Sequence, residues 1–464
     1  MTNKKAHPYI PNSAAEIQEK MLAAIGAESI DQLYETIPDS LRFKGEMNIP
    51  AAMPSEYDLQ RHIKKVLAKN KSCADYTSFL GAGCAQHYVP AICDEINQRS
   101  EFLTAYAGEP YEDLGRFQAL FEYASMLGEL LDLEAVNIPT YDWNQAAATS
   151  IRMCARMTDR SEILVSELVA PERLSTIENY CRSALKITTV AHNKQSGLVD
   201  LEDLKSKLNE NIAGFYFENP SFIGCIETQG QEISDMLKSV GAVGIAGVDP
   251  ISLGVLATPI QYGCEITCGD LQPLGIHMNT GGGQAGFIAT PDEVKFVQEY
   301  PSRLFGVSKT AVEGEWGFGD ILYDDRTSFG AREKGKEFVG TASALWGLTA
   351  GVYLALMGPD GIVQVGETII RNANYAKQQI AKIPGVEIRY PKTATFKEFV
   401  IDFNKSGKTC QQVAQALLEK GLIAGLDLTD KLAGFENCML ICVTEVHTSE
   451  EIDQLAAAIG EILK

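Results

Sequence analysis

Short apolar runs alternate with amphipathic stretches from about residue 115 onward, and this alternation restricts the fold more than any other feature of the chain. Residues 116–131 place apolar side chains at helical spacing, and the small side chains of 143–157 permit close packing, so we expect both segments to be helices. Strands that alternate with helices form a mostly parallel sheet with helices on both faces. The pattern therefore predicts an α/β domain with strands at 132–139, 161–167, 184–191, 213–220, 242–250 and 264–270.

Two further regions flank this domain. The first hundred residues contain helical patterns joined by proline-bearing extended segments, and the last hundred contain a mixture of helices and strands. We therefore predict an N-terminal helical and extended segment (1–100), a large α/β domain (101–350) and a small C-terminal α+β domain (351–464). In the small domain we expect strands at 385–391, 396–403 and 439–446, and helices at 410–420 and 449–463.

The charge of the chain argues against some classes of partner. It has 61 acidic and 40 basic residues, a net charge of −21, and the acidic residues are dispersed. Such a surface repels phosphate backbones and anionic lipids, so we expect neither nucleic acid nor a membrane as a partner. The sequence shows no apolar stretch of about 18 residues and does not open with a signal-peptide pattern, which favours a cytoplasmic protein.

The cysteines indicate a reduced interior. There are 11 of them, an odd number, and no Cys-x-x-Cys spacing occurs. Cys264 and Cys268, like Cys438 and Cys442, lie in apolar runs with the character of strands. We interpret these four residues as buried thiols rather than metal ligands. The six dispersed histidines add no zinc-binding pattern, so we expect no metal site.

A glycine-rich turn, Gly281 to Gly283, follows the last of the expected strands in the α/β domain. Consecutive glycines permit positive φ angles and close backbone approach, which can cradle a phosphate group. Yet no lysine occurs between Lys238 and Lys295, where an enzyme that binds a phosphorylated aldehyde cofactor would carry one. A tight turn at a subunit interface is the alternative interpretation, and the missing lysine favours it.

Several sequence words, taken in order, resemble one family. A large α/β domain followed by a small α+β domain is the general shape of the fold-type I pyridoxal phosphate (PLP) enzymes, although shape alone is only an analogy. The words, which extend from about residue 7 to residue 458, are similar to subunit 1 of the two-subunit glycine decarboxylase, the P-protein of the glycine cleavage system. They are HPYIPN, FLGAGCAQHYVPAI, RSEFLTAY, NPSFIGCIE, DPISLG, RLFGVSKT, ALWGLTAGVYLALMGPDG, LLEKGLIAGLDL and LICVTEVHTSEEIDQL.

This resemblance implies an explanation for the missing lysine. In that family two homologous halves share the work: the second subunit carries the lysine that binds PLP, and the first is a degenerate copy that completes the active-site channel. Counting back from the glycine turn, the place of the lysine falls at or beside Gln272. A glutamine amide cannot form an imine, so we expect this chain to bind no PLP covalently and to contain no catalytic residue.

The same resemblance implies a degenerate cofactor site. In a working PLP subunit an aspartate at the place of Asp249 holds the pyridine nitrogen protonated, although here a turn or helix-cap role is the alternative. The turn before residues 143–157 would bind the phosphate on helix-terminal N–H groups, but the bulk of Trp143 obstructs it. Ala170 stands where the family carries a histidine. The members of this expected pseudo-site are Asn144, Gln145, Asp249, Gln272, Gly281 and Gly282.

A second group of residues resembles the family's substrate channel. The segment FLTAYAGEPYEDLG keeps part of a family segment that approaches the partner's glycine and lipoyl pocket. Its tyrosines could donate hydrogen bonds to a substrate carboxylate, or simply pack at an interface with satisfied hydroxyls. The substrate or channel contacts implied by the resemblance are Thr104, Tyr106, Tyr111 and Glu112.

The leading hypothesis is an accessory subunit of a glycine dehydrogenase (decarboxylating). The resemblance implies an α2β2 heterotetramer with a lysine-bearing homologous subunit that holds PLP, decarboxylates glycine and passes the aminomethyl group to a lipoyl carrier, the H-protein. One alternative is a self-sufficient fold-type I PLP enzyme for another small amino acid, with Lys309 or Lys334 as its lysine, although both lie beyond the glycine turn. The other alternative is a non-catalytic or regulatory paralogue.

Overall fold

The structure, a computed structural model of the 464-residue chain, describes residues 6–7, 9–10, 12–102, 116–301, 304–321, 336–337 and 342–464. The chain separates into two compact units, residues 1–70 and residues 71–464. Each unit is described by itself below. The domain boundaries expected at 100/101 and 350/351 stay predictions.

The first unit contains helices but no core of its own. Its elements are α1 (Ala15–Ala24), the 3-10 helices η1 (Ile30–Tyr34) and η2 (Asp39–Leu41), and α2 (Glu56–Leu67). The Ser55 hydroxyl caps α2 by accepting the N–H of Asp58 at 3.2 Å. None of the described side chains in this unit is buried, and Leu41 and Phe43 are 75% and 73% exposed. A 12-residue helix such as α2 is marginal in water without tertiary packing.

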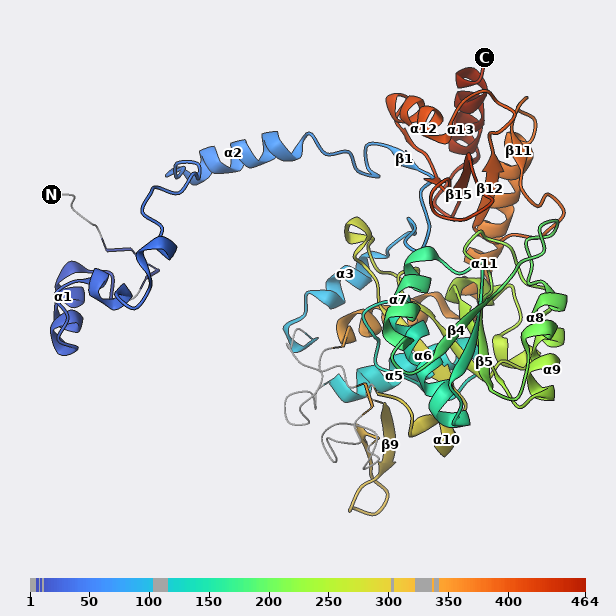
Figure 1. Ribbon diagram of the computed structural model, residues 1–464, viewed down its shortest axis with the longest axis horizontal. Coiled ribbons are helices and arrows are strands. Elements are labelled where there is room, and N and C mark those ends of the chain that lie inside the picture. Colours follow the sequence, from blue (N-terminus) through green and yellow to red (C-terminus); the bar gives the residue numbers. More distant parts are fainter. Residues whose placement is uncertain are drawn as a thin grey trace. The chain divides into compact units, whose positions relative to one another are not determined.

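A seven-stranded sheet forms the centre of the second unit, in the order β2-β8-β7-β6-β5-β3-β4 (Figure 1). Strands β4, β3, β5, β6 and β7 pair in parallel, and β8 pairs antiparallel with both β7 and β2. This arrangement confirms the predicted α/β class with a mostly parallel sheet. The bounds are β2 (Ala135–Val136), β3 (Glu162–Ser166), β4 (Lys186–Val190), β5 (Ile212–Glu218), β6 (Val243–Val248), β7 (Ile266–Asp270) and β8 (Gly286–Thr290).

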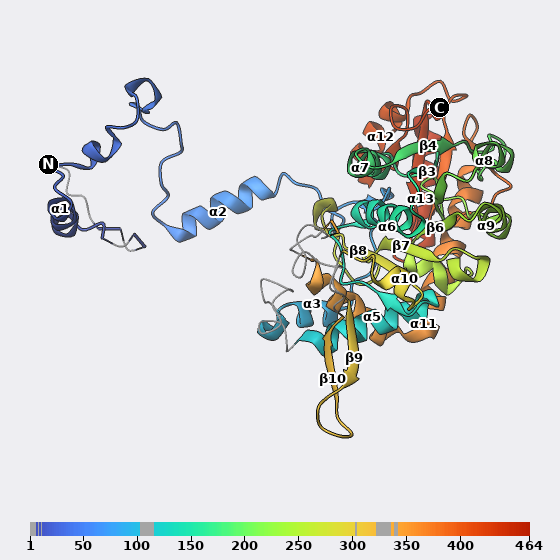
Figure 2. The ribbon, with the colours of Figure 1, turned by 60° about the horizontal axis from the view of Figure 1, so that its bottom comes forward.

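Helices cover both faces of this sheet. Because successive residues of a strand point to opposite sides, each buried strand packs against helices on both faces. On β3, Ile163 and Val165 pack with α6 (Trp143–Thr158) and α7 (Pro171–Cys181), whereas Leu164 packs on the other face with α8 (Leu201–Lys207) and α9 (Gly230–Ser239). Figure 2 shows α6 and α7 on one side of the sheet and α8 and α9 on the other. The buried strands thus read as continuous apolar runs, as expected for a parallel sheet.

The C-terminal part of the second unit is built on a four-stranded antiparallel sheet in the order β11-β12-β15-β14. Helices α12 (Cys410–Glu419) and α13 (Ser449–Ile462) pack against it, and each begins with a capping box, at Thr409 and Thr448. The four cysteines expected to be core thiols are buried and free. The strand bounds are β11 (Glu387–Ile388), β12 (Glu398–Asp402), β14 (Leu426–Asp427) and β15 (Cys438–Cys442).

Helix α11 (Ala344–Ile380) connects the two sheets. It is interrupted at Gly358, whose φ of 60° and ψ of 179° are not helical, directly before Pro359. By length and composition α11 could span a membrane, but its first half packs along α5 (Phe117–Leu131) and its second half joins the core of the small sheet. Burial in this unit therefore explains part of its apolar character.

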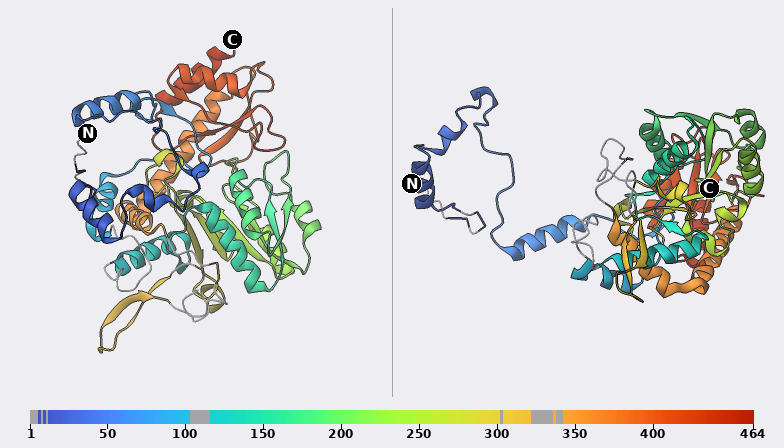
Figure 3. Two further views of the ribbon diagram at one scale, coloured as in Figure 1. Left: turned by 60° about the vertical axis from the view of Figure 1, so that its left-hand side comes forward. Right: turned by 90° about the horizontal axis from the view of Figure 1, so that it is seen from below.

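Some elements carried no signal that we recognised in the sequence. The hairpin of β9 (Phe305–Lys309) and β10 (Trp316–Asp320) projects from the rest of the unit (Figures 2 and 3). Strand β1 (Thr77–Ser78) pairs in parallel with β13 (Leu422–Ile423), and strands this short have no readable period. The remaining elements are α3 (Ala91–Asn97), η3 (Ser100–Phe102), η5 (Pro250–Gly254), η6 (Pro259–Tyr262), η7 (Asn279–Gly281) and α10 (Val294–Val297).

Candidate functional site

Three acidic side chains meet at the carboxyl edge of the large sheet. Glu218 is the last residue of β5, Asp249 follows β6, and Asp270 is the last residue of β7. These three strands are neighbours and run parallel, so their carboxyl ends lie at one edge. In open α/β sheets this edge is where ligands bind. The fold thus places these carboxyl groups at the edge of the sheet where a ligand would be expected to bind.

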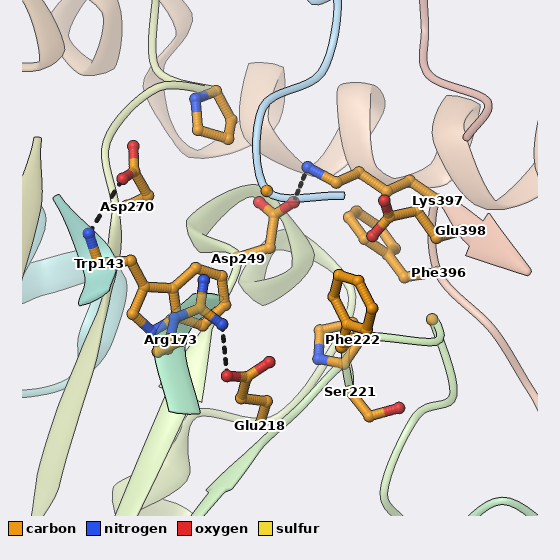
Figure 4. Close-up of a pocket in the computed structure, with 14 residues that line it drawn as sticks. Trp143, Arg173, Glu218, Ser221, Phe222, Asp249, Asp270, Phe396, Lys397 and Glu398 are labelled. Atoms are coloured by element: carbon orange, nitrogen blue, oxygen red, sulfur yellow. Dashed lines mark hydrogen bonds and ion pairs between the residues drawn. The ribbon is translucent and has the colours of Figure 1, made fainter. Parts of the chain in front are cut away.

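The three carboxyl groups line a small pocket (Figure 4). Its other polar walls come from Trp143 at the start of α6, Arg173 in the first turn of α7, and Lys397 with Glu398 at the start of β12. The cavity has a volume of about 50 Å³. An engineered cavity of ~150 Å³ binds benzene, so a space of about 50 Å³ is too small for a pyridine ring with substituents.

Trp143 and Arg173 fill one side of the pocket. The Arg173 guanidinium lies 3.7 Å from the centroid of the Trp143 ring, in a cation–π stack. Arg173 also pairs with Glu218, which accepts a hydrogen bond from the Tyr216 hydroxyl at 3.1 Å. Burial raises the pKa of Glu218, and the charge of Arg173 opposes this rise. The stack is therefore anchored to the end of β5 by a buried ion pair.

The indole of Trp143 lies against β6 because Gly247 has no side chain. A Cβ atom at residue 247 would come within 2.9 Å of Trp143 Cζ2 and 2.6 Å of Tyr216 Oη. Such distances are well inside van der Waals contact, so any other residue at this position would displace the indole or the tyrosine. Gly247 thus permits the close approach that buries the ring.

Asp249 is held from two directions. One carboxylate oxygen accepts the N–H of Ile251 at 3.0 Å and so caps η5, as in the alternative considered for this residue. The other oxygen lies 2.6 Å from Lys397 Nζ, and the two side chains are 8% and 14% exposed. Burial by itself would lower the pKa of Lys397, but the Asp249 carboxylate raises it above its ordinary value. The ion pair joins the large sheet to the small sheet.

Asp270 binds backbone N–H groups. Its Oδ2 accepts the N–H of Trp143 at 3.2 Å, and its Oδ1 accepts the N–H of Gln272 at 2.8 Å and that of Ala285 at 3.4 Å. Burial raises the pKa of Asp270 to about 7, although these hydrogen bonds act in the opposite direction. Asp270 thereby ties the amino end of α6 to the turn between β7 and β8.

Gln272 does not line the pocket. Its Nε2 donates to the carbonyl groups of Ala85 at 3.0 Å and Ile276 at 3.1 Å, and its Oε1 accepts the N–H of Ala85 at 3.2 Å. The side chain is 1% exposed. Its amide is therefore used to hold the segment around Ala85, and it points at backbone groups rather than at the space beside Asp249.

The other residues expected at the site are dispersed. Of the expected pseudo-site, the pocket wall includes only Asp249. Asn144 and Gln145 are partly buried in the first turn of α6, where the Gln145 side chain accepts the N–H of Tyr141 at 2.9 Å. Gly281 and Gly282 form an exposed turn between β7 and β8. The expected channel contacts, Thr104, Tyr106, Tyr111 and Glu112, lie outside the described residues.

Neither lysine considered for a self-sufficient PLP enzyme is among the described residues of the pocket wall. Lys309 is exposed on β9, with its Nζ 5.7 Å from the centroid of the Trp316 ring, and it does not line the pocket. Lys334 lies outside the described residues. The pocket wall contains Lys397 and Arg173 instead. The sequence analysis did not predict either residue as part of the site. The signal for both was weak: a charged residue next to an apolar run, which usually indicates a solvated face.

The residues present do not fit PLP, the cofactor implied by the resemblance. The volume is too small, and the ring of Trp143 lies on the strand that carries Asp249. In the pocket wall two basic side chains face four carboxyl groups. A phosphate group would add further negative charge to this set. The pocket therefore lacks the room for the cofactor.

Comparisons with known proteins agree on one family. The family model described as glycine cleavage system P-protein matches residues 7–459. A probable glycine dehydrogenase (decarboxylating) subunit 1 from Moorella thermoacetica is 37% identical over 457 residues, which cover 98% of this chain and 99% of the relative. The same-named protein of Staphylothermus marinus is 35% identical over 466 residues, which cover 99% of this chain and 98% of the relative.

Solved structures give the same picture at the level of the fold. A crystal structure of glycine decarboxylase (P-protein) of the glycine cleavage system, in inhibitor-bound form, has a TM-score of 0.83 and 30% identity, covering 98% of this chain and 100% of that chain. A sphingosine-1-phosphate lyase from Burkholderia pseudomallei has a TM-score of 0.64 at 13% identity, which shows the shared fold alone.

Proposed function

Because this chain belongs to the glycine cleavage system P-protein family, we propose that it is the lysine-lacking subunit of a heteromeric glycine dehydrogenase (decarboxylating). A homologous lysine-bearing subunit completes the enzyme and binds PLP. The assembly decarboxylates glycine and transfers the aminomethyl group to a lipoyl carrier protein. Two copies of each subunit form the heterotetramer.

The observation that carries this proposal is the state of Gln272. The residue at the expected place of the lysine has an amide that cannot form an imine, and all three of its hydrogen bonds go to backbone groups. The chain has thus replaced a reactive amine with a structural amide. The family supplies the reaction, and Gln272 supports the assignment of this chain to the half that does not hold the cofactor.

Within the first unit, helix α2 presents an apolar face that the rest of that unit leaves exposed. Its apolar side chains, such as Leu59, Ile63 and Val66, are 44% to 47% exposed and recur at helical spacing on one face. A helix with an exposed apolar face and no core gains stability when that face is covered by another protein surface. Obligate interfaces of this kind are large and rich in apolar residues. The lysine-bearing subunit is the surface that we propose for it.

In this proposal the chemistry and the support lie on different chains. PLP, held by the partner, supplies an electron sink for the loss of CO2 from the α carbon of the amino acid. This chain contributes walls of the channel and stability. Thr104, Tyr106, Tyr111 and Glu112 are its proposed contacts with substrate or channel, as the resemblance implies.

The test is reconstitution. This chain, a lysine-bearing homologous subunit and the lipoyl carrier protein are purified separately and mixed, and exchange of labelled bicarbonate into the carboxyl group of glycine is measured. We expect exchange only when both subunits are present, and co-elution of the two on size exclusion. Glycine-dependent exchange by this chain alone would overturn the proposal, as would borohydride trapping of PLP on one of its lysines.

A further inference from the structure

We infer that side chains of this protein occupy the three places that the phosphate, the ring and the pyridine nitrogen of PLP take in a working subunit. Asp270 takes the phosphate place, the Trp143 ring takes the ring place, and Lys397 takes the place of the pyridinium. The pocket is therefore closed to the cofactor independently of the loss of the lysine. This inference concerns the pocket of this chain alone and stands whether or not the proposed assembly forms.

The phosphate place is the amino end of α6. Backbone N–H groups there carry a partial positive charge and bind phosphate in proteins that use such a site. Here the N–H of Trp143 donates to Asp270, and the N–H of Gln145 donates to the Asp142 side chain at 2.7 Å. The N–H of Ala146 donates to the Asp142 carbonyl at 3.1 Å. Two carboxyl groups thus accept two of these N–H groups, and a backbone carbonyl accepts the third, so these donors are already used within the chain.

The ring place lies between that helix end and Asp249. Residues 247 and 249 point to the same side of the chain, because side-chain direction alternates along an extended strand. A ring bonded to Asp249 would therefore lie over Gly247, where the Trp143 indole now packs. The Arg173 guanidinium covers the other side of the indole at 3.7 Å. The aromatic group of the chain is thus held between the backbone at Gly247 and the Arg173 guanidinium.

The pyridinium place is beside the Asp249 carboxylate. A cationic ring nitrogen would pair with this carboxylate, and the Lys397 ammonium does so at 2.6 Å. The carboxylate has its counter-ion within the chain, so a ring nitrogen gains nothing by approaching it unless the lysine leaves. Lys397 does not serve as an imine-forming lysine instead, because the aldehyde of PLP lies at the opposite end of the ring from the nitrogen.

This arrangement predicts that lysine alone does not restore the site. A Gln272→Lys variant would place its amine among the backbone groups of Ala85 and Ile276, with the pocket still filled. Opening the pocket requires changes at the ring and phosphate places. Trp143→Gly removes the ring, and Asp270→Asn removes the carboxylate charge while it keeps one oxygen as an acceptor.

The experiment measures binding of pyridoxine 5′-phosphate, which has the ring and the phosphate but no aldehyde, by equilibrium dialysis. The unaltered chain and a Trp316→Gly control, in which an exposed tryptophan is removed, should show no saturable binding. The Trp143→Gly/Asp270→Asn variant should bind one equivalent, at least tenfold more tightly than the weakest binding that the dialysis can detect for the unaltered chain. A further Lys397→Met change should tighten binding again. Equal binding by the unaltered chain, or no gain in a double variant with native circular dichroism, would overturn the inference.

A second measurement avoids the risk that the double variant does not fold. The chain has three tryptophans, and Trp316→Phe with Trp346→Phe leaves Trp143 as the sole emitter without altering the pocket wall. Titration with pyridoxine 5′-phosphate, which forms no imines with surface lysines, up to millimolar concentration should leave Trp143 emission unchanged beyond the inner-filter correction measured on free tryptophan. Saturable quenching would mean that the ring and phosphate enter the pocket, and would refute the inference.

Discussion

Replacing Lys397 by methionine should destabilise the chain more than any surface change of the same kind. Lys397 Nζ lies 2.6 Å from Asp249 Oδ2, and the side chains are 14% and 8% exposed. At an effective dielectric constant of about 20, charges at 2.6 Å attract by about 6 kcal/mol, and desolvation offsets part of this. Removing one partner of a buried pair costs about 3–5 kcal/mol, because the other charge stays buried and unpaired.

This free energy corresponds to a measurable change in the melting temperature. Unfolding entropy is about 2.1 cal/mol/K per residue, so a unit of about 400 residues (71–464) loses about 5 °C for 4 kcal/mol. Thermal denaturation followed by circular dichroism measures this shift. Methionine keeps most of the length of the lysine side chain, so the change tests charge rather than packing.

Two further variants make the result interpretable. Lys405→Met removes the partner of Glu387 in an exposed ion pair. The Lys405 and Glu387 side chains are 68% and 55% exposed, so this change should leave Tm unchanged. Asp249→Asn combined with Lys397→Met leaves no charge behind and keeps an oxygen for the N–H of Ile251, so it should recover most of the loss. Equal effects of Lys397→Met and Lys405→Met, or no recovery in the double variant, would refute the reasoning.

Three other predictions follow from the described contacts. Gln272→Lys should lower Tm by about 1–4 °C, because it loses the acceptor for a buried N–H, and should trap no PLP with borohydride. Gln231→Lys, at an exposed position of α9, is the control, and PLP trapped at position 272 would contradict the prediction. Because the pKa of Asp270 is raised to about 7, its protonation stabilises the fold at low pH and this contribution is lost as pH rises toward 7. Asp270→Asn should therefore make Tm less dependent on pH between about 4 and 7, and an unchanged dependence would sink the assignment. Ile63→Asp should abolish co-elution with the lysine-bearing subunit without lowering Tm, whereas Lys65→Asp on the other face of α2 should not; equal binding by both variants would show that α2 is not part of the interface.

The main architecture could be predicted because it depends on local pattern. The buried strands of the large sheet are apolar runs long enough to recognise, and β5 is buried at every one of its positions. Strand β8 was missed. Its apolar run, GFIAT, follows the glycine turn directly, and the described residues between it and β7 form no α-helix, whereas α7, α8 and α9 separate β3, β4, β5 and β6. Two-residue strands such as β1 and β13 depend wholly on tertiary pairing.

The pocket could be predicted only in part, for the same reason. The amide of Gln272, where the resemblance implies a lysine, and the bulk of Trp143 are residue types that a sequence displays. The ion pair of Asp249 with Lys397 joins residues far apart in the chain, and no local pattern indicates that pairing. The stack of Arg173 on Trp143 likewise depends on how α6 and α7 pack. The sequence therefore indicated the unusual residue types at the pocket but not the ion pair and the stack that fill it.

The filled pocket also limits how this chain can be altered one residue at a time. Its filling groups come from the start of α6, the first turn of α7, the end of β7 and the residue before β12. Removing one of these groups leaves either a void or an unpaired charge beside the others. A variant of this chain that is meant to accept a ligand here therefore has to change several of these positions together.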